Sequence, residues 1–92
     1  MARFLIEVPH SSDEVECLRV IQIFLRTGSH FLANVDWGCM DGVHKAWAIV
    51  EVENKDEARS VLPPAFRPQA NIISLNKFTM NDVEVHLSQQ QV

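Results

Sequence analysis

The sequence lacks several features that mark common classes of protein. Neither cysteine, Cys17 or Cys39, belongs to a Cys-x-x-Cys motif, so a zinc-ribbon or thioredoxin-type site has no signature here. Gly-rich phosphate loops, nucleophile elbows and paired catalytic carboxylates are also missing. The longest unbroken apolar run, residues 46–50, is far shorter than the roughly 20 residues that cross a bilayer. We therefore expect a cytoplasmic protein with reduced thiols and no membrane association.

A basic surface is missing as well. Twelve Asp and Glu residues against eight Lys and Arg residues give a net charge of −4, and like charges form no run. Proteins that bind nucleic acids need clustered cations to displace counterions from phosphates. Anionic membrane surfaces demand the same kind of patch. The charge pattern therefore excludes nucleic acid as an expected partner and disfavours a lipid surface.

What is present suffices for one small domain, expected over residues 1–92 with an ordered part of about 2–88. Period-two alternation predicts strands, and apolar residues at helical spacing predict helices. In the first helix the apolar stripe is expected at Leu18, Ile21 and Leu25, widened by Cys17 and Phe24. The expected elements are a strand at 3–8, a helix from the Ser11-x-x-Glu14 capping box to Gly28, strands at 30–39 and 43–53 around an Asp41-Gly42 turn, a helix from Asn54 to Pro63, a strand at 70–78 and a helix capped by Thr79 and Asp82.

This order predicts an α+β, ferredoxin-like βαββαβ fold with an extra C-terminal helix and a four-stranded antiparallel sheet. Right-handed crossovers place the first and third strands in the centre, with both main helices on one face. The other face still carries Leu5, Trp47, Ile49 and either Ile72 or Ile73. Monomers rarely expose an apolar patch of that kind. We therefore expect a homodimer or higher homo-oligomer in which two sheets close a shared barrel.

Short segments of the chain resemble a known superfamily. They are Phe24-Leu25-Arg26-Thr27-Gly28, Asp36-Trp37-Gly38, Ala48-Ile49-Val50-Glu51-Val52 and Asp56-Glu57-Ala58. With the order of elements over residues 3–78, they look like small dimeric α/β-barrel proteins, including uncharacterised muconolactone-isomerase-like domains. The resemblance implies a fold and an oligomer. It leaves the chemistry open, because related folds serve as monooxygenases, isomerases, dehydratases and haem-degrading proteins.

Candidate catalytic residues are His44, His30 and Asp36. His44 follows the expected turn and can approach Cys39 or Trp37, where an imidazole beside a carboxylate makes a usable base. His30 and Asp36 share one face of the expected strand but lie about 20 Å apart at strand rise, so they do not touch. The alternative is that His44 is a solvated hairpin residue.

Candidate ligand-binding residues are Trp37, Trp47 and Arg67. The two tryptophans lie on neighbouring strands and can wall a pocket for a small organic ligand; otherwise they pack in the core or an interface. Arg67, held in a Pro-rich loop, can clamp a carboxylate; otherwise it pairs with a surface acid.

No metal or cofactor is expected, since the spacing of His10, His30 and His44 matches no ligand motif. The leading hypothesis is a cofactor-independent isomerase or related enzyme that moves a proton on a small organic acid or lactone. The alternative is a non-catalytic small-ligand-binding or dimerisation module. Convergence of titratable groups on one cavity would favour the enzyme.

Overall fold

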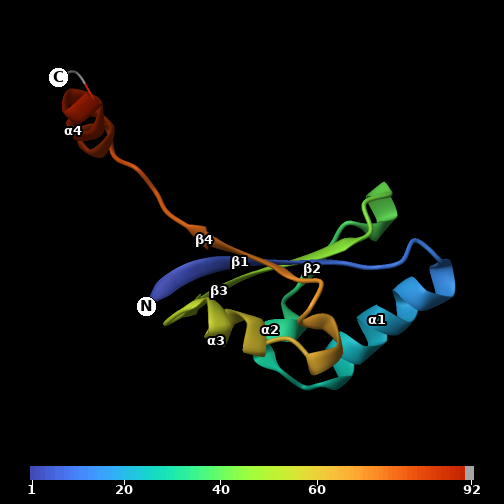
Figure 1. The fold of residues 1–92 in the computed structure, drawn as a ribbon. Coiled ribbons are helices and arrows are strands. Elements are labelled where there is room, and N and C mark those ends of the chain that lie inside the picture. The colour runs from blue at the N-terminus through green and yellow to red at the C-terminus, as the bar shows by residue number, and fades with distance from the viewer. Residues whose placement is uncertain (91–92) are drawn as a thin grey trace.

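A computed structural model describes residues 1–90 as a four-stranded antiparallel sheet with helices (Figure 1). The strand order β2-β3-β1-β4 confirms the prediction that the first and third strands are central. The elements are β1 (Ala2–Pro9), α1 (Glu14–Arg26), α2 (His30–Ala33), β2 (Asp36–Trp37), the 3-10 turn η1 (Cys39–Asp41), β3 (Lys45–Val52), α3 (Lys55–Ser60), the 3-10 turn η2 (Pro64–Phe66), β4 (Asn71–Leu75) and α4 (Met80–Gln90). Residues 91 and 92 of the expected domain lie outside the described part.

The core lies between the sheet and helices α1 to α3, which cover one side of it (Figure 1). Alternation in β1 sends Phe4, Ile6 and Val8 to this side, where all three are buried. Ile6 stands opposite Ala48 of β3 and Ile72 of β4, so the three central strands contribute one continuous apolar layer. The predicted period-two pattern of β1 is therefore confirmed.

The predicted strand at residues 30–39 is wrong. Residues His30–Ala33 form helix α2, and β2 retains only Asp36 and Trp37. The Ser29 hydroxyl accepts a hydrogen bond from the backbone N–H of Leu32, which caps a helix at the point where a strand was expected. Leu32 is consequently the buried residue of this segment, while Phe31 is exposed.

The connection to β3 also differs from the expected two-residue hairpin turn. Residues Cys39–Asp41 form the 3-10 turn η1, and only Gly42 adopts a left-handed conformation, with φ of 80°. A type I′ turn needs positive φ at both central residues, and Asp41 does not have it. The result is a longer loop between β2 and β3 that carries Cys39.

Helix α1 begins and ends close to the predicted residues but turns a different face inward. Its N-cap is Asp13, whose carboxylate accepts from the N–H of Glu16, and Gly28 follows the helix with φ of 71°. Cys17 and Phe24, seven residues apart, are buried, whereas Leu18 and Leu25 are more than half exposed. The face is selected by aromatic packing, because the Phe24 ring meets Trp37 and Phe66 edge-on, each at 5.2 Å.

The face of the sheet opposite the helices, here called the helix-free face, carries an apolar row. Leu5 stands opposite Ile49 on one side and Ile73 on the other. Ile49 is 63% exposed and Ile73 is 45% exposed. The prediction of apolar residues on both faces is confirmed, and Ile73, not Ile72, belongs to the helix-free face.

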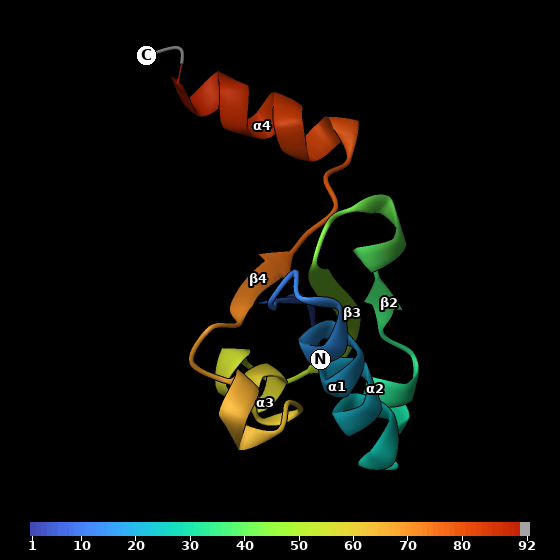
Figure 2. The same cartoon turned by 90° about the vertical axis from the view of Figure 1, so that its right-hand side faces the viewer.

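Helix α4 stands away from this body (Figures 1 and 2). Thr79 and Asp82 exchange the expected capping hydrogen bonds, 2.9 Å and 3.1 Å long. Strand β4 ends at Leu75, short of the predicted residue 78, so the chain between Leu75 and α4 runs free of the sheet. Among residues 1–90, no helix combines the length and the apolar character needed to cross a bilayer.

Polar contacts on the helix-free face centre on Glu7. Its carboxylate accepts hydrogen bonds from Trp47 Nε1 at 3.0 Å and Asn71 Nδ2 at 3.2 Å, and Lys45 Nζ lies 3.6 Å away. These contacts, the Trp47 hydrogen bond foremost, hold the pKa of Glu7 below its usual 4.5. The ionised carboxylate therefore ties three strands together.

We expect Glu7→Gln to lower the unfolding free energy by about 1 kcal/mol at pH 7, because a charge-assisted hydrogen bond is replaced by a neutral one. A carboxylate whose pKa is depressed by folding stabilises the fold above its unfolded pKa, and this stabilisation disappears as pH falls through the folded pKa. Urea unfolding of both proteins from pH 7 to pH 3 should therefore show curves that converge at acid pH. A difference in unfolding free energy that stays constant with pH would contradict this role. Glu53→Gln, at an exposed glutamate just after β3, is the matched control.

Candidate metal centre

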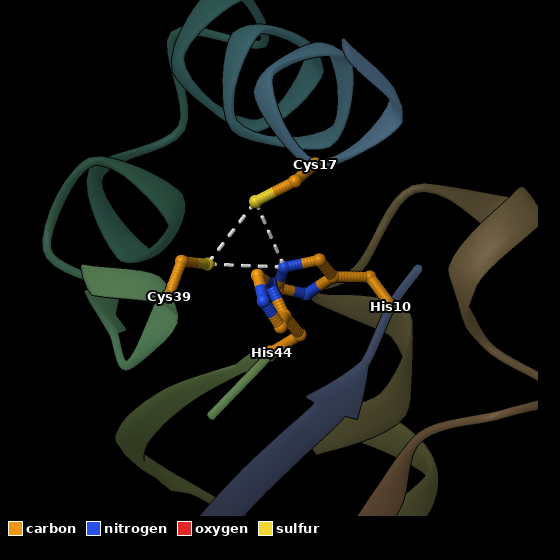
Figure 3. A group of neighbouring side chains, drawn as sticks. All are labelled: His10, Cys17, Cys39 and His44. Atoms are coloured by element: carbon orange, nitrogen blue, oxygen red, sulfur yellow. Dashed lines mark hydrogen bonds between the residues drawn. The ribbon is translucent and has the colours of Figure 1, made fainter. Parts of the chain in front are cut away.

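Four side chains from separate parts of the chain meet at one end of the sheet (Figure 3). They are His10, Cys17, Cys39 and His44, and their candidate ligand atoms all lie within 4.8 Å of one another. Cys17 is buried, and the other three are partly buried. Two thiols and two imidazoles in one place form the donor set of a Cys₂His₂ metal site.

The two histidines are brought together by the central ladder of the sheet. His10 directly follows β1 and His44 directly precedes β3, and Pro9 stands opposite Lys45 at the end of that ladder. The backbone N–H of His10 donates to the carbonyl of His44 at 3.1 Å, which extends the pairing by one more step. Antiparallel pairing therefore fixes these two side chains as neighbours.

Cys17 reaches the site from the first turn of α1. Its backbone N–H donates to the carbonyl of the N-cap residue Asp13 at 2.8 Å, so its place on the helix is set by the cap. Phe24 lies on the same face two turns later and is completely buried. Packing of Phe24 thus turns the Cys17 thiol toward the sheet.

Cys39 is placed by a tight loop around Gly38. The N–H of Gly38 donates to the carbonyl of Lys45 at 3.1 Å, and its own carbonyl accepts from Asp41 and Val43, both at 3.0 Å. A Cβ at Gly38 would lie 2.7 Å from the Trp47 ring and 2.7 Å from the Val43 carbonyl oxygen. Only glycine fits this close approach, which holds Cys39 near the start of β3.

Three of the contacts within the cluster are short. His10 Nε2 lies 3.3 Å from Cys17 Sγ and 3.1 Å from Cys39 Sγ, and the two sulfurs are 3.2 Å apart. Tetrahedral zinc separates two sulfurs by about 3.8 Å and a sulfur from a nitrogen by about 3.6 Å, from ordinary bond lengths. The three atoms therefore need to spread by roughly half an ångström to hold a zinc ion.

The pKa shifts in the cluster concern one imidazole, His10, and one thiol, Cys17. Burial lowers the pKa of His10; a hydrogen bond with the backbone of Val8 opposes this in part, and the neighbouring His44 lowers the pKa further, so the neutral imidazole is favoured at pH 7. The hydrogen bond with Cys39, together with burial, raises the pKa of the Cys17 thiol. Neutral imidazole binds metals directly, whereas each thiol must release a proton when a metal binds.

Two buried nitrogens of the cluster lack hydrogen-bond partners. Within residues 1–90 they are Nδ1 of His10 and Nδ1 of His44. Leaving a buried polar atom unpaired costs about 1–3 kcal/mol, so folds rarely tolerate it without reason. Either imidazole nitrogen can ligate a metal when it carries the lone pair, so an ion bound at Nδ1 would supply the partner that this His44 atom lacks.

The surroundings leave one side of the cluster accessible. The His10 ring packs edge-on against Trp37 at 5.6 Å and against His44 at 5.7 Å. On the outer side, a pocket of about 420 Å³ borders the cluster. Its lining comprises Cys17, Cys39 and His44 of the cluster, with Ser12, Glu14, Leu18, Ile21 and Met40 around them. A metal ion can enter from this pocket.

Comparison of the chain with protein-family models, curated proteins and solved structures gave no match. The case for a metal site therefore depends on the geometry of the four side chains.

Of the three predicted catalytic residues, only His44 joins the cluster. Its predicted approach to Cys39 is confirmed. His30 opens α2 as an exposed residue and lines a different pocket, with Ile49 and Glu51. Asp36 is exposed on the edge strand, opposite Trp47. The structure therefore does not bring His30 or Asp36 to His44.

The three predicted ligand-binding residues also lie apart. Trp37 packs with Phe24 on the helix-covered side of the sheet, while Trp47 donates to Glu7 on the helix-free face, so they share no pocket wall. The Arg67 guanidinium donates to the carbonyls of Leu62 at 2.9 Å and Ser60 at 3.2 Å, at the end of α3. The guanidinium N–H groups of Arg67 thus bind backbone carbonyls at the end of α3.

The sequence interpretation did not connect Cys17 or Cys39 with a metal, because Cys17 was interpreted as a core residue and Cys39 as a residue beside a turn. His10 was weighed as a ligand only with His30 and His44, whose spacing matches no ligand motif. One signal was available, because Cys39 and His44 flank a turn at Cys-x₄-His spacing. The other two lie across the fold, where spacing along the chain carries no information.

Proposed function

We propose that the protein binds a transition-metal ion, zinc in the first place, through His10, Cys17, Cys39 and His44. The observation that carries this proposal is the convergence of four ligand atoms within 4.8 Å from four separate segments. Thiolate and imidazole donors favour zinc over the hard cations Mg²⁺ and Ca²⁺, which prefer oxygen. Four protein ligands fill a tetrahedral shell, which is typical of structural zinc.

Such an ion would fasten α1 and the loop after β2 to the paired ends of β1 and β3. It would connect the end of β1, the first turn of α1, the loop after β2 and the start of β3. Because the ligands come together only in the folded chain, metal binding would add directly to folding stability. The protein would then be a small metal-dependent module.

Cobalt spectroscopy tests the proposal, because Co²⁺ reports tetrahedral thiolate ligation by its visible absorption. We expect one equivalent of Co²⁺ to give these bands and one equivalent of Zn²⁺ to remove them. Cys17→Ser and His10→Gln should each weaken binding by more than about 100-fold, since even second-shell changes cost 10–100-fold. His30→Gln and His86→Gln, at exposed histidines outside the cluster, are the matched controls and should bind normally. Bands that survive in the cluster variants, or that never form, would overturn the proposal.

A second candidate function keeps the proton-transfer hypothesis with His44 as the base. The pocket of about 420 Å³ beside His44 supports it, because Leu18, Ile21 and Met40 give that pocket an apolar wall suited to a small organic acid or lactone. The βαββαβ order and the 2-3-1-4 sheet support a ferredoxin-like description and the resemblance to dimeric α/β barrels. Turnover that persists in metal-free protein and disappears in His44→Ala would favour this candidate over the metal module. Ligand binding without turnover would indicate a small-ligand module instead.

A further inference from the structure

Two apolar surfaces of the chain have no partner within residues 1–90. One is the row on the helix-free face, Ile49, Leu5 and Ile73, which runs across three strands. The other is helix α4, whose Met80, Val83 and Leu87 recur at helical spacing and are all at least 40% exposed. No other described element packs extensively against α4.

Helix α4 is poorly suited to stand alone. It has 11 residues, and isolated helices shorter than about 12–15 residues are marginal in water. Its capping box at Thr79 and Asp82 defines where it starts, but a cap contributes only about 1 kcal/mol. A helix with an apolar stripe and a well-defined start therefore needs a surface to pack on.

The path of the chain directs α4 away from its own sheet. Between Leu75 and Met80 the backbone continues outward from β4, and α4 lies beyond the sheet on the side without helices (Figures 1 and 2). No glycine or proline occurs in this stretch to reverse the chain. The molecule consequently measures 56 Å along its longest axis against 28 and 21 Å, and its radius of gyration is 16.8 Å. A compact chain of this length would have a radius of gyration of about 12 Å.

One ion pair is available between α4 and the helix-free face. The helix carries Asp82 and Glu84 and no lysine or arginine. The face carries Arg3, which stands opposite Glu51 but forms no ion pair within residues 1–90. A carboxylate arriving with a helix can pair with the Arg3 guanidinium.

We propose that two copies of this chain form a dimer in which α4 of each packs on the helix-free face of the other. The apolar row would meet the Met80, Val83 and Leu87 stripe, and Glu84, which borders that stripe on the helix, would face Arg3. Each chain gives its α4 to the other, so the two chains are related by a two-fold axis. Both helix-free faces are then covered, and no third chain can bind in the same way. This interface is separate from the metal cluster, so either proposal can fail alone.

Cysteine cross-linking tests which chain α4 reaches. Mixed Ile49→Cys and Val83→Cys proteins should form a disulfide-linked heterodimer under mild oxidation. Gln22→Cys, on the exposed side of α1, should not link to Val83→Cys and is the matched control. The unsubstituted protein, oxidised under the same conditions, shows whether Cys17 or Cys39 alone links two chains. A double variant that links within one chain and runs as a monomer would overturn the exchange.

Light scattering on the full chain gives the second readout. The parent should be a dimer at micromolar concentration, and Val83→Asp with Leu87→Asp should weaken it by at least about 100-fold, since two apolar contacts become charged. Gln89→Asp, which adds a charge to α4 outside the apolar stripe, is the control and should leave the dimer intact. Far-ultraviolet circular dichroism and cooperative urea unfolding should remain intact in these variants, which shows that they fold. A monomeric parent, or a dimer unaffected by the α4 charges, would overturn the proposal.

Discussion

Zinc in excess, buffered at a free concentration of about 1,000 times its dissociation constant, is expected to raise the melting temperature by at least about 15 °C over chelator-treated protein. An ion present at about 1,000 times its dissociation constant stabilises the native state by about 4 kcal/mol. In a domain of this size each kcal/mol shifts the melting temperature by roughly 4–8 °C. The measurement is a thermal unfolding scan with and without chelator, with zinc added back to show reversal.

Variants of the cluster distinguish zinc bound by these four side chains from zinc bound elsewhere on the protein. Cys39→Ser should lose most of the shift, because it removes one ligand and leaves the loop around Gly38 unchanged. His30→Gln should keep the whole shift, since His30 lies on α2 and outside the cluster. Equal shifts in the two variants would show that zinc acts elsewhere on the protein.

Phe24→Ala is expected to cost about 3–5 kcal/mol of unfolding free energy, the usual range for a fully buried phenylalanine. Phe24 is completely buried and packs edge-on against Trp37 and Phe66. Loss of this ring removes the contact that joins α1 to the core, so the Cys17 thiol would also lose its fixed direction. Denaturant unfolding and Co²⁺ affinity, measured on the same protein, should therefore both fall.

Phe31→Ala is the control for that variant. Phe31 is 40% exposed on α2, so its removal should cost well under half as much. If Phe24→Ala lowered stability yet left Co²⁺ affinity unchanged, Phe24 would be a core residue without a role in placing Cys17. An effect equal to that of Phe31→Ala would contradict the packing of α1 described above.

A metal site also fits the size of the core. A chain of 92 residues buries only about 60–65% of its unfolded surface, and small domains often add a metal or a partner to reach adequate stability. Here α1 offers mainly Cys17 and Phe24 to the interior, while Leu18 and Leu25 remain exposed. An ion bound at Cys17 would fasten the end of α1 that Phe24 does not reach.

Much of the fold was predictable because it depends on local patterns. Alternation in β1 and β3 assigned Ile6 and Ala48 to the core and Leu5 and Ile49 to the other face, and register pairing confirmed this. The segment before β2 was not predictable in the same way. Its alternation imitated a strand, but the Ser29 cap stabilised a helix and buried Leu32 instead. A single capping hydrogen bond outweighed a short pattern.

By itself, the sequence determined the order of the elements, the sheet with a second apolar face, and the helix caps at Asn54 and Thr79. Each of these follows from neighbours a few residues apart. Only the tertiary structure decided that His10, Cys17, Cys39 and His44 share one site. Their convergence depends on the antiparallel register of β1 with β3, on the packing of α1 and on the loop around Gly38. Such contacts form between distant segments, and spacing along the chain does not encode them.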